Sequence, residues 1–338
     1  MRHLALVLSC AAILGGCAPA PGTRNDGAAT NGAGFDGNES TDTGTAASND
    51  VARPYALEFL LAYENVRSAP YYPLEGLAGI CWYGDGSLYI CDEKAGRVHG
   101  YSPADDLWFQ FDSPGTRFFR PVDVQIDHFK VLVLDMEGRS LLRYDLGGAY
   151  QDRLVSFAHL DPGYDRLPSS FDIDVDGRLV FTDASESQAV LLDSFLAIQT
   201  TVGGPGSHRE QFQEPSGVAF LNDGSFVVAD RANRRLQHFS RLGYLEKVVG
   251  GEFDRHNALL TPQGLDTDPD GNLFVADPAG RAVHAYGPDL TLLFSTDSSL
   301  GLLASPQLPI DVAVGPDDLL AVADRDRQAV LIYRILYR

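Results

Sequence analysis

An aspartate recurs through the chain at nearly constant spacing. The intervals between successive members are 43, 48, 47, 47 and 47 residues. The members are Asp92, Asp135, Asp183, Asp230, Asp277 and Asp324. Six carboxylates in one ring could bind cations. In several units, however, an arginine follows four or five residues later, which favours a structural role in which the carboxylate accepts backbone N–H groups of a turn and pairs with the arginine.

Asp123 and Asp311 stand two residues after a recurring proline, near the expected start of a strand. A Ca²⁺ ion takes about six to eight oxygen ligands, and two carboxylates with carbonyls and water could supply some of them. The interpretation that we favour is that these aspartates cap backbone N–H groups or face a water-filled channel. We therefore predict no metal site and no cofactor, with Ca²⁺ as the alternative.

Cys81 and Cys91 lie on either side of Gly84-Asp85-Gly86. A three-residue loop at 85–87 would put the two cysteines opposite each other on antiparallel strands, at a Cβ separation that suits a disulfide. Export to an oxidising compartment would favour the bond. We predict this disulfide; a change of register by one residue would instead leave two buried free thiols.

The N-terminus predicts export. Arg2 precedes an apolar run from Leu4 to Leu14, which has the length of a secretory segment and is too short for a membrane-spanning helix. The run ends in Leu14-Gly15-Gly16-Cys17, which resembles the bacterial lipobox. This resemblance implies a signal peptide at 1–16 and acylation of Cys17.

Residues 17–53 are expected to form a lipidated, disordered tether, because Gly, Ala, Asn, Thr and Ser dominate and large apolar residues are almost absent. Ala18 rather than Asp follows the cysteine, so the lipobox resemblance implies no inner-membrane retention signal. We expect a lipoprotein of the bacterial cell envelope on the periplasmic or surface side, with the outer membrane favoured.

The formal net charge of −20 limits the partners. Nucleic-acid backbones are bound by dense Lys and Arg, and anionic lipid headgroups attract basic segments. We therefore expect no nucleic-acid partner, and membrane contact through the lipid anchor only.

The remaining chain repeats one unit. A proline opens each unit at intervals of 48, 47, 47, 47 and 47 residues; these are Pro73, Pro121, Pro168, Pro215, Pro262 and Pro309. In the unit 215–240, a strand precedes the turn Asn222-Asp223-Gly224 and an apolar strand follows it. Two more strands complete the period. Four strands in about 47 residues predict one blade of a β-propeller.

The pattern P-x-G-V-A…D-G-x-hydrophobic-V-A-D…R resembles the NHL repeat, most closely in Pro215–Ser240 and Pro262–Gly287. The resemblance implies an all-β, six-bladed β-propeller of four-stranded antiparallel blades over residues 54–338. The last unit ends after its third strand, and Tyr55–Ala62 looks like the missing fourth. We expect this N-terminal strand to close the ring and remove an exposed sheet edge.

The peptidylglycine amidating lyases are NHL-type propellers in which zinc-binding histidines follow the blade-opening prolines. Here the corresponding positions hold no zinc ligand; they are Leu74 or Ala78, Val122, Ser169, Ser216, Gln263 and Ile310. This departure argues against that activity.

Loops before the first two blades hold Tyr71, Tyr72, Phe119 and Arg120. Aromatic and arginine side chains often anchor partners, so these four are candidate binding residues beside Asp123 and Asp311. We expect a scaffold that binds an envelope protein, a peptide or a glycan. The alternatives are an enzyme that uses the central channel, such as a lyase or a calcium-dependent hydrolase, and a purely structural envelope component.

Overall fold

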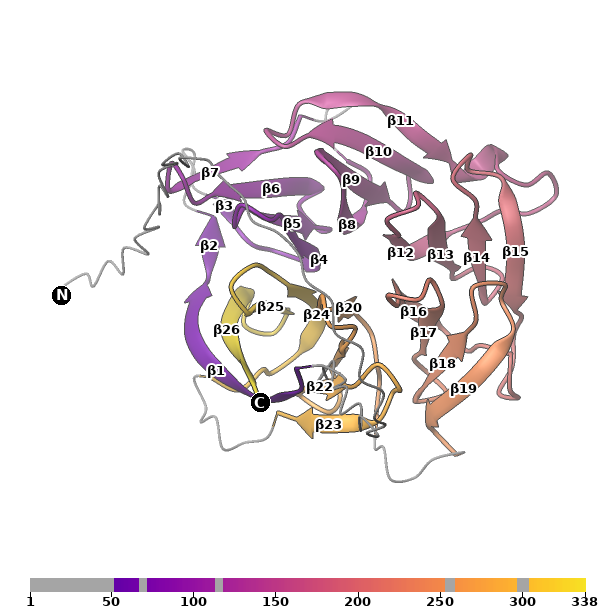
Figure 1. The fold of residues 1–338 in the computed structure, drawn as a ribbon. Helices are drawn as coiled ribbons and strands as arrows, with labels where there is room; N and C mark the ends of the chain where they lie inside the picture. The colour runs from indigo at the N-terminus through magenta and orange to yellow at the C-terminus, as the bar shows by residue number, and fades with distance from the viewer. Residues whose placement is uncertain (1–51, 67–71, 113–117, 253–258, 297–303) are drawn as a thin grey trace, which may run out of the picture. The chain divides into compact units, whose positions relative to one another are not determined.

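The computed structural model describes residues 52–66, 72–112, 118–252, 259–296 and 304–338. These residues form six four-stranded antiparallel sheets arranged in a ring, together with one two-stranded sheet (Figure 1). The only helical segment described is a 3₁₀ turn at Phe157–His159. The predicted six-bladed all-β propeller is therefore confirmed. Of the predicted signal peptide and tether, only residues 52 and 53 belong to the described part of the chain, and Cys17 lies outside it.

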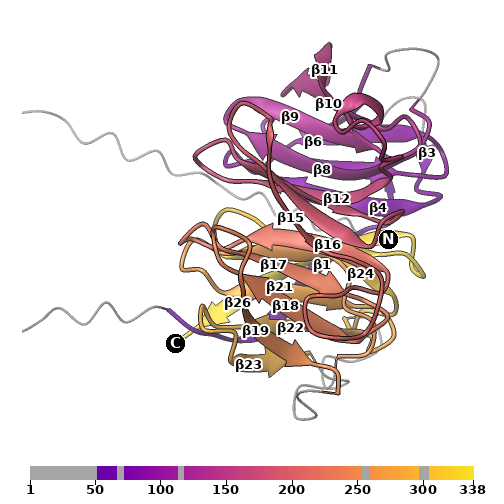
Figure 2. The ribbon, with the colours of Figure 1, turned by 90° about the vertical axis from the view of Figure 1, so that its right-hand side faces the viewer.

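The blades follow one another along the chain, and the two views of the ring show them side by side (Figures 1 and 2). The first three blades contain β4 (Leu77–Trp82), β5 (Leu88–Asp92), β6 (Arg97–Ser102) and β7 (Leu107–Gln110); β8 (Pro121–Asp127), β9 (Lys130–Asp135), β10 (Ser140–Asp145) and β11 (Tyr150–Ser156); and β12 (Pro168–Ile173), β13 (Leu179–Asp183), β14 (Gln188–Leu192) and β15 (Ile198–Gly203).

The last three blades contain β16 (Pro215–Phe220), β17 (Phe226–Asp230), β18 (Arg235–Phe239) and β19 (Leu245–Gly250); β20 (Leu265–Thr267), β21 (Leu273–Asp277), β22 (Ala282–Tyr286) and β23 (Leu292–Ser295); and β24 (Pro309–Val314), β25 (Leu319–Asp324), β26 (Ala329–Tyr337) and β1 (Pro54–Tyr63). The innermost strands, nearest the centre of the ring, are β4, β8, β12, β16, β20 and β24. In the sixth blade the outermost strand is β1, from the start of the described chain.

The sixth blade combines the two ends of the described chain. β1 pairs antiparallel with β26, from Pro54 opposite Tyr337 to Tyr63 opposite Val330. The prediction that the N-terminal strand completes the last blade is confirmed. This arrangement leaves no unpaired β26 edge at the point where the ring closes.

The start of the first blade differs from the prediction. Pro73 lies in β3 (Tyr72–Pro73), which pairs with β2 (Asn65–Val66) outside the blade. Leu77 instead occupies the position that the prolines hold in other blades, opposite the strand-ending aspartate Asp92. The first blade is shorter, as the interval of 43 residues from Asp92 to Asp135 indicates, so the proline spacing gave the wrong starting point.

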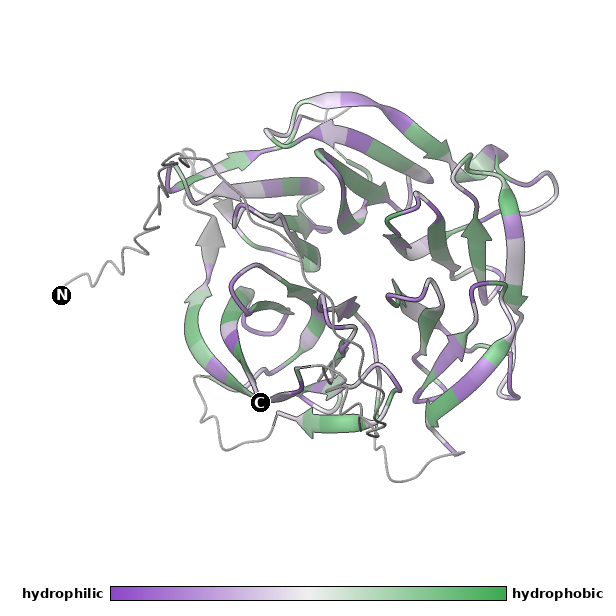
Figure 3. Cartoon of the chain, viewed as in Figure 1, coloured by the Kyte–Doolittle hydropathy of each residue, from purple (hydrophilic) through white to green (hydrophobic). Residues whose placement is uncertain are grey.

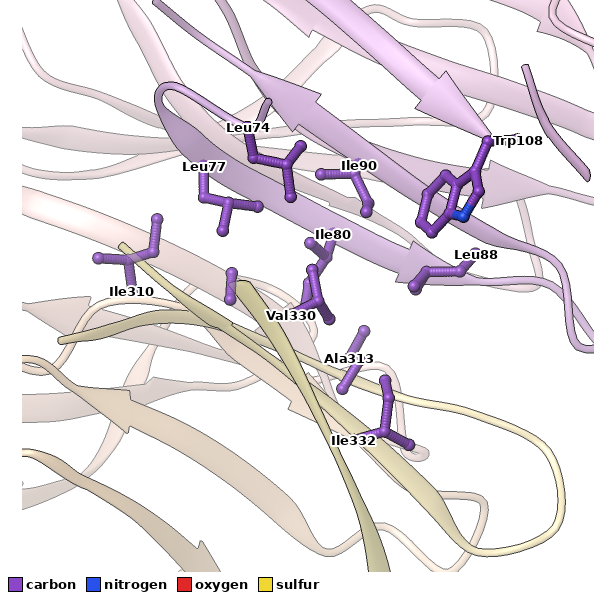
Figure 4. Packing of buried hydrophobic residues seen from close by; sticks show 12 residues of the cluster. Leu74, Leu77, Ile80, Leu88, Ile90, Trp108, Ile310, Ala313, Val330 and Ile332 are labelled. Atoms are coloured by element: carbon purple, nitrogen blue, oxygen red, sulfur yellow. The ribbon is translucent and has the colours of Figure 1, made fainter. Parts of the chain in front are cut away.

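Each boundary between neighbouring blades holds one cluster of buried apolar side chains. The second strand of a blade, such as β17, is buried along its whole length because blades pack on both of its faces. Figure 3 shows green along these middle strands and mixed colours along the outer ones. In Figure 4, Ile80, Ile90 and Trp108 of the first blade pack against Val330 and Ile332 of the sixth, which seals the ring.

The six recurring aspartates are structural, as predicted. Each is buried at the end of its strand and accepts N–H groups from the loop that enters its blade; Asp92, for example, accepts from Glu75 at 2.8 Å and Gly76 at 2.9 Å. The expected arginine pairing holds for Arg235 and Asp230, at 2.7 Å. It does not hold for Arg139, which pairs with Asp165 of the next loop instead of Asp135.

Candidate functional site

A cavity of about 480 Å³ lies where the innermost strands begin, on the side of the ring that we call the entry face. All six blades contribute the two residues that follow the blade-opening position. These are Ala78 and Gly79, Val122 and Asp123, Ser169 and Ser170, Ser216 and Gly217, Gln263 and Gly264, and Ile310 and Asp311. The positions that the sequence placed innermost therefore do line one cavity, which we call the channel-mouth cavity.

An ion-pair network forms part of the wall. Glu93 is the centre: its Oε2 lies 3.1 Å from Arg120 Nε, and its Oε1 lies 3.1 Å from Arg325 Nη2. The Glu93 side chain is only 11% exposed, whereas both guanidinium groups reach water. Arg325 Nε also donates to the Leu77 carbonyl at 3.0 Å. The network fixes two arginines from different blades at the mouth.

A second pair lies on the opposite wall, where Arg231 Nη1 is 2.9 Å from Glu214 Oε2. Both side chains are exposed, so the pair contributes little to stability and can open at low cost. Both residues also line a neighbouring groove of about 390 Å³ that includes Arg234, Leu260 and Thr261. The two cavities together could hold an extended ligand.

Asp123 and Asp311 clamp neighbouring blades together. Asp123 Oδ1 accepts the Val124 N–H at 2.8 Å, while Oδ2 accepts the Phe171 N–H at 3.0 Å and the Ser170 hydroxyl at 2.9 Å. Asp311 Oδ2 accepts the Ile80 N–H at 2.9 Å. The interpretation of these aspartates as caps is therefore confirmed, and some of the capped N–H groups belong to the adjoining blade.

Two further aspartates on innermost strands, Asp172 of β12 and Asp266 of β20, were not identified from the sequence. Asp172 Oδ2 accepts the Phe220 N–H and Asp266 Oδ2 accepts the Val314 N–H, both at 2.7 Å. Each stands four residues after a blade-opening proline. Alternate residues of a strand project to the same side, so these side chains project to the same side as the residue two positions after the proline. This alternation in the sequence could have identified them.

Burial between the blades raises the pKa of all four carboxyl groups. Desolvation raises the pKa of Asp123 to about 6, of Asp172 to about 8 and of Asp266 to about 7, against the opposing effect of the N–H groups that they accept. Desolvation also raises the pKa of Asp311, and the nearby charge of Asp123 adds to the increase. The pKa values of Asp123, Asp172 and Asp266 therefore lie near neutrality.

Close approach of the inner strands requires glycine at three wall positions, Gly79, Gly217 and Gly264; a Cβ on Gly217 would overlap the Gln263 carbonyl oxygen. A Cβ on Gly264 would lie 2.5 Å from Asp311 Cα, and one on Gly79 would lie 2.5 Å from Asp123 Cα. Neither distance is possible for a real side chain. Gly79 and Gly264 therefore let the strand that carries Asp123 or Asp311 pack directly against the preceding blade.

The other predicted binding residues divide into two groups. Arg120 lines the cavity, and Phe119 is 73% exposed on the adjoining loop. Tyr71 and the side chain of Tyr72 lie outside the described part of the chain. The structure therefore brings Arg120, Asp123 and Asp311 together in one cavity, with Phe119 beside them in sequence.

The predicted disulfide between Cys81 and Cys91 is wrong: both are buried free thiols. The turn is closed by the Tyr83 N–H and the Ser87 carbonyl at 2.8 Å, so Cys81 faces Tyr89 across the strands and Cys91 pairs with Val98. The loop is centred one residue earlier than predicted. Burial raises the pKa of both thiols, which disfavours the reactive thiolate.

The cavity wall mixes polar and apolar side chains. It presents hydroxyl, amide, guanidinium and carboxyl groups beside apolar residues such as Val122, Met136 and Ile310. Within the described residues, no three His, Cys, Asp or Glu side chains are grouped so that they could hold a metal ion.

None of the described segments forms a helix of the length and hydrophobicity needed to cross a bilayer.

Comparison with known proteins supports the fold. The sequence matches the NHL repeat family over residues 212–239, and no curated protein sequence matches the chain. A gluconolactonase from Xanthomonas campestris is similar with a TM-score of 0.61 and 14% identity, over 84% of this chain and 97% of that one.

Two other solved structures are also similar. The calcium-binding protein regucalcin from Agrobacterium tumefaciens gives a TM-score of 0.58 at 15% identity, over 84% of this chain and 95% of that one. A virginiamycin B lyase from Staphylococcus aureus gives 0.54 at 14% identity, over 84% and 90%. Identities this low establish a common fold and nothing more. The chain is thus a six-bladed β-propeller that carries an NHL repeat in its fourth blade.

Proposed function

We propose that this propeller is an exported, lipid-anchored protein that binds a polar, carboxylate-bearing ligand of the cell envelope in the channel-mouth cavity. A peptide, a glycan or a loop of an envelope protein can present such a group. The acylated Cys17 would hold the propeller at the membrane, and residues 17–53 would space it from the anchor. The observation that carries the proposal is the convergence of Arg120, Arg231 and Arg325 on one cavity.

The chemistry of the wall suits such a ligand. Guanidinium groups bind carboxylates through paired, charge-assisted hydrogen bonds, and Arg231 can exchange its exposed partner Glu214 for a ligand carboxylate. Ser169, Ser216 and Gln263 offer hydroxyl and amide groups for neutral polar parts of the ligand. A volume of about 480 Å³ falls in the range of small-ligand sites.

The experiment is site-specific photo-crosslinking in intact cells. A photo-reactive amino acid replaces Met136, a neutral residue of the cavity wall. The matched control replaces Phe129, an exposed residue at the turn between β8 and β9. We expect one reproducible adduct from position 136 and none from position 129, with Arg231→Gln reducing its yield. Absence of an adduct at 136, or identical adducts at both positions, would refute the proposed site.

A second function, an enzyme acting in the same cavity, is favoured by one observation. Asp123 lies on the wall with a pKa of about 6 and contacts the Ser170 hydroxyl. A carboxyl group with such a pKa can act as general acid or base near neutral pH. The structures named above as a lyase and a gluconolactonase have this fold, which permits this alternative without assigning it.

The two functions differ in what happens to the bound ligand. A binding protein releases the crosslinking partner unchanged, whereas an enzyme alters its mass. Comparison of the ligand recovered from wild-type protein and from Asp123→Asn by mass spectrometry distinguishes them. A mass change that occurs only with the wild type would favour the enzyme.

A further inference from the structure

The face opposite the channel-mouth cavity carries exposed apolar residues at the tips of its turns. We call it the turn face; it holds the turns that join the first to the second strand and the third to the fourth strand of each blade. Val175, Phe195 and Leu242 are 95%, 89% and 61% exposed there. They stand in three different turns, after β12, β14 and β18.

These three turns adjoin one another at the boundary of the third and fourth blades. Arg178, from the turn of Val175, donates to the carbonyl of Arg241, which precedes Leu242, at 3.4 Å. Within the third blade, a Cβ on Gly177 would lie 3.7 Å from Ser194 Cβ, so the turn of Val175 also touches the turn of Phe195. Val175, Phe195 and Leu242 therefore stand on adjoining turns, and we call these three exposed residues the apolar tips.

Two ion pairs lie next to the apolar tips. Asp174 binds Arg178 at 2.6 Å, and Asp176 binds Arg241 at 2.9 Å. Asp193, two residues before Phe195, accepts the backbone N–H groups of Phe195 and Ala197 and has no cationic partner among the described residues, so the three turns carry a small excess of negative charge. Exposed apolar side chains that lie near one another can form a contact surface.

The described chain also begins on the turn face. The carbonyl of Ala52 accepts a hydrogen bond of 3.0 Å from Asn272 Nδ2, in the turn between β20 and β21. Pro54 pairs with Tyr337 at the end of β26, which runs toward the same face. Residue 52, to which the tether of the proposed function is joined, therefore lies on this face.

We propose that the apolar tips dock onto the surface of a zwitterionic lipid bilayer, so that the channel-mouth cavity faces away from the membrane. The inference rests on the lipid anchor of the proposed function, because a tether raises the effective concentration of the bilayer at this face. The lipid is zwitterionic because a chain with a net charge of −20 is repelled by anionic headgroups.

The geometry gives the orientation. Ser169, near the start of β12, lines the cavity, and Val175 follows the end of the same strand. Six residues of extended chain span roughly 20 Å. When the tips touch the lipid, the cavity therefore opens toward the aqueous phase, where a ligand can reach it.

The experiment uses the predicted mature chain, residues 17–338, which includes the whole described propeller. Cys17 is attached to a maleimide lipid in phosphatidylcholine vesicles, so the result does not depend on acylation in the cell. Phe195→Trp places a fluorescent probe at the tips; Phe119→Trp, the matched control, places one at an exposed position on the entry face. Quenching by lipids with brominated acyl chains is measured against the unsubstituted chain.

We expect at least a twofold greater quenching at position 195 than at 119, and a decrease when anionic phosphatidylglycerol replaces a third of the lipid. Equal quenching at both positions, none at either, or stronger quenching in anionic vesicles would overturn the inference. Failure of the proposed function is seen separately, because mass spectrometry of the exported protein shows directly whether Cys17 is acylated.

Discussion

Asp311 of the last blade accepts the backbone N–H of Ile80 of the first blade at 2.9 Å, across 231 residues of sequence. The contact crosses the point where the ring closes and lies at the wall of the channel-mouth cavity. A buried N–H without an acceptor is costly. The carboxyl group therefore has a structural role in addition to any contact with a ligand.

The first prediction concerns this contact. Asp311→Ala leaves the Ile80 N–H without its acceptor and should lower the free energy of unfolding by about 1–3 kcal/mol. Asp311→Asn retains an oxygen acceptor and is the matched control, with a smaller loss. Urea unfolding at pH 6 followed by tryptophan fluorescence measures both. Equal losses for the two variants would contradict the role assigned to the hydrogen bond.

The second prediction is a decrease of stability with rising pH. Asp172 and Asp266 have pKa values of about 8 and 7 in the folded chain, whereas the pKa of an aspartate in an unfolded chain is about 3.9. Between these values the folded state binds more protons than the unfolded state. The free energy of unfolding is therefore greatest at low pH and falls as the pH rises from about 4 to 8.

Urea unfolding at pH 5 and pH 8 tests this dependence. The double variant Asp172→Asn/Asp266→Asn should reduce it and leave only the part that Asp123 and Asp311 contribute. Asp289→Asn is the control, because hydrogen bonds from Thr291 lower the pKa of Asp289 and keep it ionised at both pH values. A slope that is unchanged in the double variant would show that Asp172 and Asp266 do not contribute to the pH dependence.

The fold could be predicted from the sequence because each blade repeats the same local signals. An apolar second strand and a terminal aspartate recur in all six blades, and an Asp-Gly turn precedes the second strand in four of them. Each of these signals acts within its own blade. The inward positions, including Asp123 and Asp311, could be identified for the same reason. The closing strand was predictable because the last unit lacks one strand and the sequence before the first unit supplies it.

The remaining features depend on contacts that no single repeat contains. Glu93, Arg120 and Arg325 meet only when the first, second and sixth blades adjoin. The disulfide prediction failed because the register of β4 and β5 depends on the turn at Tyr83 and on an irregularity between Leu77 and Ile80. Neither feature is visible in the spacing of the cysteines.

The third prediction tests the ion-pair network of Glu93. Glu93→Gln removes the charge that holds Arg120 and Arg325 together at 3.1 Å each, and leaves two like charges close to each other. Because both guanidinium groups reach water, we expect a loss of only about 1 kcal/mol at low salt, and a smaller loss at high salt. Glu214→Gln, which breaks an exposed pair, should change stability by less than about 0.5 kcal/mol. A larger loss of stability in Glu214→Gln than in Glu93→Gln would contradict this prediction.

The fourth prediction concerns Gly264, whose lack of a side chain makes room for Asp311. Gly264→Ala places a Cβ 2.5 Å from Asp311 Cα, so the two blades must separate, with a loss of about 1–3 kcal/mol. Gly84→Ala is the control, because a Cβ there meets no atom within 4 Å. Calorimetry should show a lower melting temperature for the first variant alone. If both variants have the same melting temperature, the close approach of the blades does not contribute to stability.

The fifth prediction tests closure of the ring by β1. Leu57 is buried in the apolar cluster between the fifth and sixth blades, whereas Leu61 of the same strand is exposed. Leu57→Ala should therefore cost about 2–5 kcal/mol, and Leu61→Ala less than about 0.5 kcal/mol. Hydrogen exchange of the β26 amides that pair with β1 should accelerate only in the first variant, because weaker packing lets β1 detach. Unchanged exchange in Leu57→Ala would mean that β1 does not protect the sixth blade, and the ring would have to be held closed by the contacts between the first and sixth blades alone.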